Sequence, residues 1–284
     1  MTQVCVVGSV NVDQFFRVAV LPGAGETVLG SAVTTEPGGK GGNQAVAAAR
    51  AGADVQFVGA VGSDAAGTRL RAHLRDNGVG LDGLQELPVA SGSAVILVDD
   101  HAENMIVVAP GANGHLTLSS AAARAVIATC EVLLVQLEVP IATALAAARE
   151  ARSVGATVIV NASPVSTDPL LRELAAVTDV VIVNDAEEPY WPWPTTHFVV
   201  TRGARGASYR GPGGDLEVPS PGVEAVDTTG AGDVFAGVLA AEWTTGHDRA
   251  LRRACAAGAL ATLVPGAGDC APVAEAIEDA LTRY

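Results

Sequence analysis

Short runs of apolar residues recur along the chain and alternate with longer stretches that mix alanine with polar residues. The runs include VCVVGSV, VQFVGAV, VLLVQL, TVIVNA, DVVIVN and HFVVTRG. Continuous Val- and Ile-rich runs of this length are typical of strands buried on both faces, and the intervening stretches are typical of helices. The alternation predicts a three-layer α/β/α fold with a central, mostly parallel sheet. Gly52, Gly78 and Gly155 stand where helices are expected to end.

Two regions interrupt this alternation. Residues 14–36 and 93–110 contain strand-like and turn-like segments without a helical pattern. The second region places DDHAEN between two apolar runs, which is typical of a hairpin. We expect the two regions to form a small β-sheet lid, inserted in a single domain that spans residues 1–284. The last third of the chain has a mostly helical pattern.

The composition is that of a folded, acidic protein. Hydrophobic residues make up 49% of the chain, and 17 basic residues against 31 acidic ones give a net charge of −14. Nucleic acids and anionic membranes require clustered Lys and Arg, so neither partner is expected. The N-terminus lacks the pattern of a signal peptide, and no apolar window is long enough to span a bilayer. The four cysteines are widely spaced without a C-x-x-C pair, which favours a reducing, cytoplasmic compartment.

The stretch DTTGAGDVFAGV, residues 227–238, is a glycine turn that leads into a predicted helix. Glycines leave backbone N–H groups free to face a cavity, and the helix N-terminus adds positive potential. Gly230, Ala231 and Gly232 could thus form an anion hole for a transferred phosphoryl group, with Asp233 as the base that accepts a hydroxyl proton. The alternative is that Asp233 only caps the helix. The third glycine of a dinucleotide fingerprint is absent.

A second glycine turn, GGKGGNQAVAAARAG, also precedes a predicted helix. Lys40 is not followed by Ser or Thr, so the turn is not a Walker P-loop. Lys40 and Asn43 stand where a ligand could be hydrogen-bonded. Asn11 and Asp13 lie two residues apart, on one face at the end of the first predicted strand, where open α/β sheets bind ligands. These groups suit a polyhydroxylated ligand such as a sugar, and a simple Asx turn is the alternative for Asn11 and Asp13.

Five segments, taken in order, resemble the ribokinase-like (PfkB) family of sugar kinases: GSVNVD, PGAGETV, GGKGGNQAVAAARAGA, VQLEVP and AVDTTGAGDVFAG. The resemblance covers essentially the whole chain. It implies the three-layer fold with a β lid, ATP-dependent phosphorylation of D-ribose at O5, Mg²⁺ and K⁺ as cofactors, and a homodimer formed through the lid. The alternatives are a related kinase for deoxyribose, fructose or a nucleoside, and a catalytically silent sugar-binding protein. A nucleoside kinase would need an apolar cleft for the base, for which the lid offers Phe15, Phe16 and Met105.

The resemblance also implies roles for individual residues. Asp233 is the general base, and the anion hole is Gly230, Ala231 and Gly232. The sugar-binding positions are Asn11, Asp13, Gly39, Lys40, Asn43, Glu138 and Asp233. The nucleotide-binding positions are Asn184, Thr201, Gly203, Gly206 and Gly232. Glu187, with Asn184, resembles the N-x-x-E motif that organises Mg²⁺ and phosphate. The positions that resemble a monovalent-cation site are Asp227, Thr229, Ala261, Val264, Gly266 and Cys270.

The chain departs from the family pattern at three places. Residues 185–200 are fewer than the helical segment that family members usually carry here, and the prolines of PYWPWP forbid a regular helix. A trimmed peripheral element is therefore expected. Cys255 stands where a histidine often lies near the adenine. Cys270 stands where a serine often contributes to the cation site, and sulfur is a poor ligand for hard cations.

Overall fold

A nine-stranded sheet forms the centre of the protein, whose computed structural model describes residues 1–101 and 103–283. The strand order is β13-β12-β11-β10-β9-β8-β1-β4-β5, and neighbours are parallel except at β11–β12 and β12–β13. The strands are β1 (Gln3–Val7), β4 (Asp54–Gly62), β5 (Leu84–Leu87), β8 (Val132–Gln136), β9 (Thr157–Asn161), β10 (Val180–Asn184), β11 (His197–Thr201), β12 (Ala207–Arg210) and β13 (Leu216–Val218). The prediction of a mostly parallel central sheet is confirmed.

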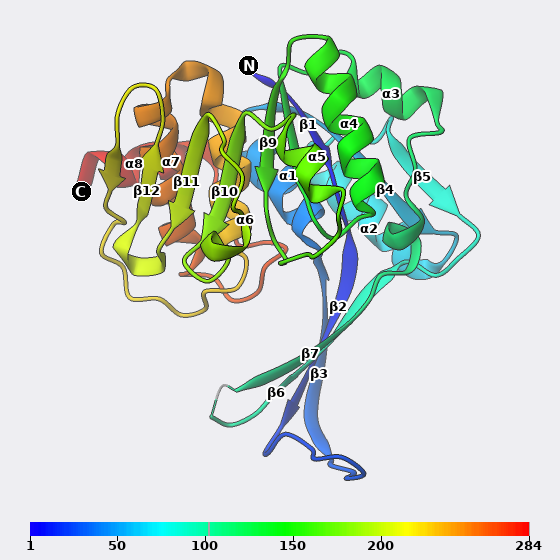
Figure 1. Ribbon diagram of the computed structural model, residues 1–284. Coiled ribbons are helices and arrows are strands. Elements are labelled where there is room, and N and C mark those ends of the chain that lie inside the picture. The colour runs from blue at the N-terminus through cyan, green and yellow to red at the C-terminus, as the bar shows by residue number, and fades with distance from the viewer. Residues whose placement is uncertain (102, 284) are drawn as a thin grey trace.

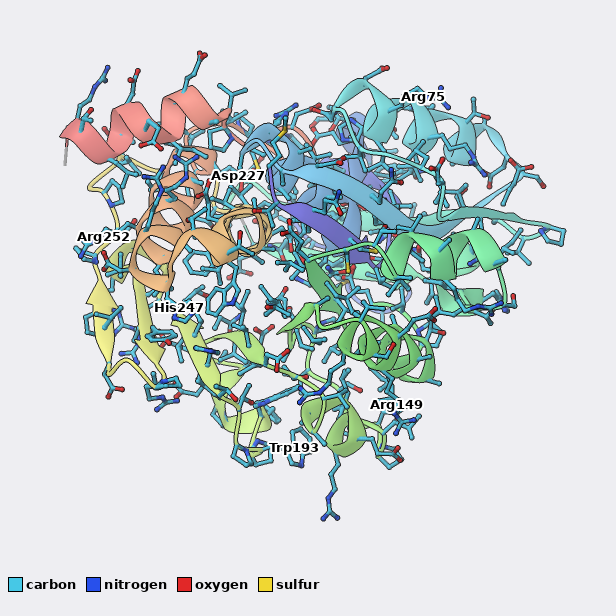
Figure 2. All side chains as sticks on the ribbon, turned by 90° about the horizontal axis from the view of Figure 1, so that it is seen from above. Arg75, Arg149, Trp193, Asp227, His247 and Arg252 are labelled. Atoms are coloured by element: carbon cyan, nitrogen blue, oxygen red, sulfur yellow. The ribbon has the colours of Figure 1, made fainter. Side chains whose placement is uncertain are left out.

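Helices cover both faces of this sheet (Figure 1). One buried cluster joins the strands to α1 (Lys40–Arg50), α2 (Ala65–Asp76), α6 (Ala231–Glu242), α7 (His247–Ala261) and α8 (Ala274–Arg283). A second cluster joins the opposite face to α3 (Ala121–Ile127), α4 (Ile141–Ser153) and α5 (Leu171–Ala175). Viewed from above, Arg75 of α2 and Arg149 of α4 lie on opposite sides of the sheet (Figure 2). Among the described residues, no helix combines the length and the apolar character that crossing a membrane would require.

Alternate side chains of each strand enter different clusters. In β1, Val4 and Val6 pack on the α1–α6 side, whereas Cys5 and Val7 pack on the α3–α4 side. A strand buried on both faces must be apolar at every position, which explains the continuous Val-rich runs of the sequence. Gly52, Gly78 and Gly155 all have positive φ, in agreement with their predicted places at helix C-termini.

Small residues allow α1 and α6 to approach each other closely. A Cβ added at Gly237 of α6 would overlap the backbone oxygen of Gln44 in α1. A Cβ added at Gly41 of α1 would lie 2.7 Å from the backbone of Gly8 and Ser9. Gly237, in the second turn of α6, therefore lets this helix approach α1, and Gly41 lets the start of α1 approach the connection that follows β1.

Two segments leave the central body and pair as a separate four-stranded sheet (Figure 1), the lid. Its order is β3 (Gly30–Gly38), β2 (Asn11–Val18), β6 (Gly92–Val98) and β7 (Asn104–Ala109). The β2–β3 and β6–β7 pairs are antiparallel, and the central β2–β6 pair is parallel. The strands extend slightly beyond residues 14–36 and 93–110. Ala102, which belongs to the predicted hairpin turn, and Tyr284, at the end of the predicted domain, lie outside the described residues.

The sequence prediction was wrong about the strand that carries Asn11 and Asp13. The first strand ends at Val7, and Asn11 and Asp13 lie at the start of β2, in the lid sheet. The chain leaves the central sheet at Gly8 and Ser9, where the Ser9 hydroxyl donates a hydrogen bond to Glu138 (2.5 Å). The two side chains still share one face, because they stand at alternate positions of the strand.

The connection between β10 and β11 contains only one short 3₁₀ turn, η2 (Glu188–Tyr190). The connection, which lies wholly within the described residues, contains no α-helix, as its prolines predicted. Trp191 is only 4% exposed and packs in the cluster that contains Val181, Val183 and Val200. The remaining 3₁₀ turns are η1 (Gly111–His115), η3 (Gly203–Arg205) and η4 (Trp243–Thr245).

Candidate active site

Asp233 lies buried in the first turn of α6, 8% exposed. Helix α6 follows Gly230, which has the left-handed conformation (φ 80°). The carboxylate of Asp233 accepts one hydrogen bond from Gln44 Nε2 (2.9 Å, at Oδ1) and one from Asn43 Nδ2 (3.1 Å, at Oδ2). Both donors belong to α1 and neither to α6. Asp233 therefore does not act as the cap of its own helix.

A chain of buried amides fixes these donors. Gln44 Nε2 also donates to Asn161 Oδ1 (2.9 Å), and Gln136 Nε2 donates to Gln44 Oε1 (2.6 Å). Gln136 and Asn161 are the last residues of β8 and β9. None of these three residues was predicted from the sequence to have a functional role. A polar residue that ends an apolar strand was the available indication for Gln136 and Asn161, because ligands bind at that edge of the sheet.

A cleft of about 110 Å³ brings Asp233 together with residues predicted to form the anion hole, to bind the sugar, to bind the nucleotide and to bind Mg²⁺. Its lining includes Lys40, Asn184, Glu187, Thr201, Gly230, Gly232 and Asp233. The negative charge of Asp233 raises the pKa of Lys40, burial opposes that rise, and the charges of Glu138 and Glu187 add to it. Lys40 is thus held as an ammonium group beside the glycine turn. A cation in this place is suited to bind phosphoryl oxygens.

The groups predicted to bind a sugar lie where the lid meets the body. Asn11 Oδ1 accepts a hydrogen bond from Asn113 Nδ2 (2.7 Å), a partner that the sequence analysis missed. Glu138 accepts hydrogen bonds from the backbone N–H of Lys40 (3.0 Å) and from Ser9. Gly39 precedes α1 with φ 86°, and a Cβ there would lie 2.8 Å from the Cα of the preceding lid connection at Val10.

The ionised form of Asp13 is disfavoured by its surroundings. Burial raises its pKa to about 7, and the nearby charges of Glu138, Glu36 and Asp233 add to the effect. Its Oδ1 atom is buried and has no hydrogen-bond partner among the described residues. A buried acceptor without a partner costs about 1–3 kcal/mol. A ligand hydroxyl that donates to Oδ1 would remove that cost.

A larger cleft of about 370 Å³ adjoins the glycine turn on its other side. It is lined by all five positions predicted to bind the nucleotide, namely Asn184, Thr201, Gly203, Gly206 and Gly232. Phe235, Cys255 and Ala259 give it an apolar wall. Burial raises the pKa of Cys255 to about 12, so the group is a neutral thiol, which lies 3.7 Å from the carbonyl oxygen of Val218. The wall suits a flat apolar ring.

Asn184 and Glu187 form one self-contained turn between the two clefts. Asn184 Oδ1 accepts the N–H groups of Ala186 and Glu187 (both 2.9 Å), and Glu187 Oε2 accepts the N–H of Asn184 (3.1 Å). The turn uses one carboxylate oxygen of Glu187. Within the described ranges, no cluster of three His, Cys, Asp or Glu side chains could hold a metal ion by itself. A metal bound here would take its remaining ligands from water or from the substrate.

The loop after α7 wraps around Asp227. Asp227 accepts the N–H of Thr229 at Oδ1 and the N–H of Gly266 at Oδ2 (both 2.9 Å). Burial opposes ionisation of Asp227, but these bonds outweigh it and hold its pKa below the ordinary value. In the part of the chain that the structure describes, the carbonyl oxygens of Asp227, Val264 and Gly266 accept no backbone hydrogen bond. These free carbonyls fit a site for a hard monovalent cation.

Cys270 belongs to the same loop, but its sulfur is a poorer ligand for a hard cation than an oxygen atom would be. Burial raises the pKa of its thiol to about 11, and the charge of Asp233 adds to this. The thiol donates to the carbonyl oxygen of Ala267 (3.3 Å). A Cβ added at Gly230 would lie 2.8 Å from the Cα of Ala267. The loop, with Ala261 at its start, therefore packs directly against the glycine turn that precedes α6.

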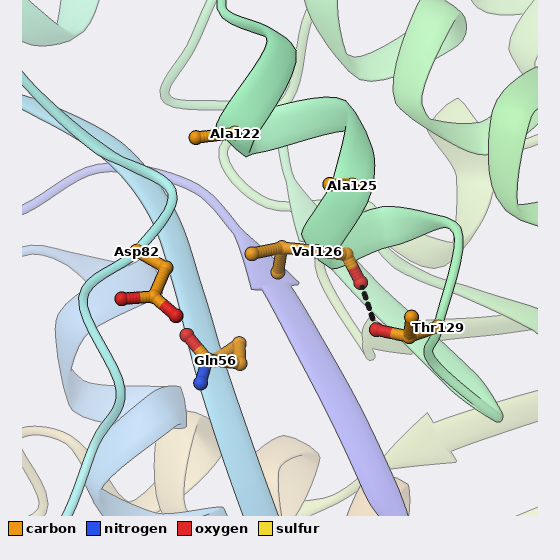
Figure 3. Close-up of a pocket in the computed structure, with 6 residues that line it drawn as sticks. All are labelled: Gln56, Asp82, Ala122, Ala125, Val126 and Thr129. Atoms are coloured by element: carbon orange, nitrogen blue, oxygen red, sulfur yellow. Dashed lines mark hydrogen bonds between the residues drawn. The ribbon is translucent and has the colours of Figure 1, made fainter.

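A separate depression of about 470 Å³ lies between β4, the β5 connection and α3 (Figure 3). Gln56, Asp82 and Thr129 contribute its polar groups, and Ala122 and Ala125 of α3 form a small-residue wall. Gln56 stands near the start of β4, at the opposite end of the sheet from Asp233. The depression brings together none of the residues predicted from the sequence.

Comparison with known proteins agrees with this geometry. A model of the pfkB family of carbohydrate kinases matches residues 1–192 and 193–274, with its break inside the trimmed connection. A ribokinase from Bacillus subtilis (strain 168) is 35% identical, covering 99% of this chain and 100% of the relative. A ribokinase from Schizosaccharomyces pombe is 33% identical, covering 84% of each. The structure of Arabidopsis thaliana ribokinase, complexed with ribose and ATP, is 27% identical with a TM-score of 0.91, covering 99% of this chain and 98% of that one.

Proposed function

The chain belongs to the pfkB family of carbohydrate kinases, and from this premise we propose that it transfers the γ-phosphoryl group of ATP to O5 of D-ribose. The chain is an ATP-dependent sugar kinase over its whole length, since its relatives align from end to end. The observation that carries the choice of ribose is the group of polar side chains at the lid base, where Asp13 Oδ1 is buried and has no partner in the described part of the chain. The relatives named as ribokinases, one of them complexed with ribose and ATP, support the same choice.

The residues around Asp233 account for the reaction. ATP would occupy the larger cleft with its base against Phe235 and Cys255, and its terminal phosphate would lie over Gly230–Gly232. The N–H groups of this turn and the Lys40 ammonium stabilise the charge on the transferred group. Asp233, held by Asn43 and Gln44, orients the sugar hydroxyl and accepts its proton as the new P–O bond forms.

A coupled assay with D-ribose, 2-deoxyribose, fructose and adenosine in turn tests the substrate. Ribose is expected to give the highest kcat/KM, because each polar group left unpaired by a poorer ligand costs about 1–3 kcal/mol. Phe15 and Phe16 point to opposite faces of β2 and Met105 is exposed, so they do not form a single base-binding cleft. A higher kcat/KM for adenosine or fructose would contradict the assignment to ribose.

The KM for ribose is expected to fall as the pH rises from 6 to 8. The pKa of Asp13 is raised to about 7 by burial first and then by neighbouring carboxylates. The ionised form accepts sugar hydroxyls best, and its share rises roughly tenfold over this range, so KM should fall up to roughly tenfold. Initial rates at several pH values measure this. The Asp13→Asn enzyme, as the control, should have a higher KM without that slope, and a flat wild-type KM would contradict the role of Asp13.

We further propose Mg²⁺ and K⁺ as cofactors. Mg²⁺ usually binds through one or two carboxylates together with substrate phosphates, and Glu187 offers one carboxylate beside the cleft. The carbonyl oxygens of Asp227, Val264 and Gly266 would hold K⁺ next to the glycine turn, together with those of Thr229 and Ala261, of which the Ala261 oxygen also accepts the N–H of Val264 (3.2 Å). Cys270 would supply no charge, because its thiol is protonated. The bound K⁺ would add positive potential near the anion hole.

Activity is expected to rise several-fold when KCl replaces choline chloride at constant ionic strength, and to rise less with NaCl. The reason is that the loop around Asp227 contacts Gly230 and would be ordered by the cation. Steady-state rates in the three salts provide the measurement. Equal rates in choline chloride and KCl would contradict the cation site.

The lid supports the proposal of a homodimer. Met105, Ile106, Val107 and Val108 of β7 are between 45% and 64% exposed, and β7 is an edge strand. An apolar edge of this kind is usually covered by another chain. Light scattering should give twice the chain mass, and Val107→Lys should shift the mass towards the monomer. A monomer mass for the wild-type protein at micromolar concentration would contradict the dimer.

The cytoplasm is the compartment that fits this function. ATP and sugar phosphates are used there, and the four cysteines are all buried, free thiols. A reducing compartment keeps cysteines in that form.

A further inference from the structure

The lid and the loop around Asp227 touch each other at two glycines. A Cβ added at Gly266 would overlap Glu36 Oε2, and a Cβ added at Gly268 would overlap the backbone oxygen of Pro37. Glu36 and Pro37 belong to β3, so this lid strand packs directly on the loop, through the Glu36 side chain at Gly266 and through its own backbone at Gly268. Gly266 is also the residue whose N–H binds Asp227 Oδ2 (2.9 Å). A movement of the Glu36 side chain would therefore displace Gly266, and through Gly266 it would affect Asp227.

On the lid itself, Glu36 is the cross-strand partner of Asp13. The antiparallel register of β2 and β3 pairs Asp13 with Glu36, which places both side chains on the same face. Like charges directly opposite each other destabilise a sheet. No basic residue occupies the neighbouring positions of this face, which are Asn11 and Phe15 on β2 and Thr34 and Gly38 on β3. The repulsion between the two carboxylates is therefore built into the lid strand that carries a sugar-binding group.

The far end of the loop is fixed to the body. Arg50 of α1 donates through Nη1 to the carbonyl oxygens of Asp269 and Ala271 (both 2.8 Å), and through Nη2 to the Asp269 carboxylate (3.2 Å). These bonds hold residues 269–271 against α1. Any rearrangement of the loop would consequently occur on the side of Gly266, where Glu36 lies.

We propose that Glu36 is a positioning residue that couples sugar binding at Asp13 to cation binding at the Gly266 loop. This inference rests on the cation site of the proposed function. A cation held by the carbonyls of the loop would lie beside the Glu36 carboxylate and offset its charge. The repulsion on Asp13 would then be smaller, and Asp13 would accept sugar hydroxyls at lower cost. Linkage requires the reverse as well, so sugar binding would tighten cation binding by the same factor.

Calorimetry without ATP measures this coupling separately from catalysis. The Kd for ribose is determined in KCl and in choline chloride at equal ionic strength, and the ratio of the two values is the coupling factor. The wild-type protein is expected to bind ribose about 5-fold or more tightly in KCl. Glu36→Gln removes the charge and should bring the factor close to 1, with tighter ribose binding than wild type in choline chloride. Glu36→Asp keeps the charge but withdraws it from Gly266, and should also reduce the factor.

Glu103→Gln serves as the matched control, because Glu103 is an exposed lid carboxylate in the β6–β7 turn. It should keep the wild-type factor. Melting temperatures in the two salts show independently whether K⁺ binds each variant. If both Glu36 variants kept the wild-type coupling factor while K⁺ still raised their melting temperatures, the role of Glu36 would be overturned and the cation site would stand. No effect of K⁺ on wild-type melting would overturn the cation site and the inference together.

Discussion

Replacing Asp233 with asparagine is expected to lower kcat by at least about 10²-fold, because a general base contributes about 10²–10⁴-fold and asparagine accepts no proton. The fold should persist with a modest loss of stability. The Asp233 carboxylate accepts from two amide groups, Gln44 Nε2 and Asn43 Nδ2, whereas asparagine offers only one acceptor oxygen. One donor then loses its partner, at a cost of about 1–3 kcal/mol in unfolding free energy. Steady-state kinetics and thermal melting of one purified variant measure both effects.

Asp64→Asn provides the matched control. Asp64 caps α2, where its Oδ1 accepts the N–H of Gly67 (2.7 Å) and the hydroxyl of Ser91 (2.7 Å). This variant should lose some stability and keep its kcat. A folded Asp233→Asn enzyme with the wild-type kcat would show that Asp233 is not the base.

The second large effect is expected from Gly230→Ala, with a loss of about 10²-fold or more in kcat/KM, comparable to removing one donor of an anion hole. Gly230 has φ 80°, and its added Cβ would lie 2.8 Å from the Cα of Ala267. The alanine is therefore strained and also displaces the loop or the turn. Either movement takes the N–H groups of the turn away from the phosphoryl group. Kinetics with ATP and ribose, together with melting in KCl, provide the measurement.

Gly155→Ala separates backbone strain from this displacement. Gly155 has φ 84°, and nothing lies within 4 Å of its added Cβ. The substitution should cost about 1–2 kcal/mol in stability, which is the penalty of the left-handed conformation, and leave kcat/KM unchanged. If Gly230→Ala behaved in the same way, the close contact with Ala267 would have no part in catalysis.

The sequence allowed the prediction of those features that depend on local pattern. Buried parallel strands are apolar at every position, so the Val-rich runs located β1, β8 and β10 directly. The glycine turn before α6 was also recognisable, because a ligand that approaches the backbone closely requires glycine. The five positions predicted to bind the nucleotide line one cleft, although they come from three separate segments of the chain.

Other features depend on contacts that no local pattern encodes. Gln44, Gln136 and Asn161 meet only because α1, β8 and β9 end at the same place, so their amide chain was not predicted. Asn11 and Asp13 were assigned to the end of a strand of the central sheet, since GSVNVD continues its apolar pattern. The departure of the chain at Ser9 depends on Glu138, which is distant in sequence. Such long-range bonds become visible only in the folded chain.

The short connection between β10 and β11 shows that two parallel neighbours of this sheet can be joined without a crossover helix. The chain returns from the end of one strand to the start of the next within residues 185–196, and one indole ring, that of Trp191, shields the sheet surface there. The residues predicted to bind substrates stand at strand ends and in turns, and in this segment they end with the turn formed by Asn184 and Glu187. Length variation among relatives should therefore concentrate in residues 192–196, beyond that turn and beyond Trp191, which makes them a natural position for inserting a tag or a reporter domain.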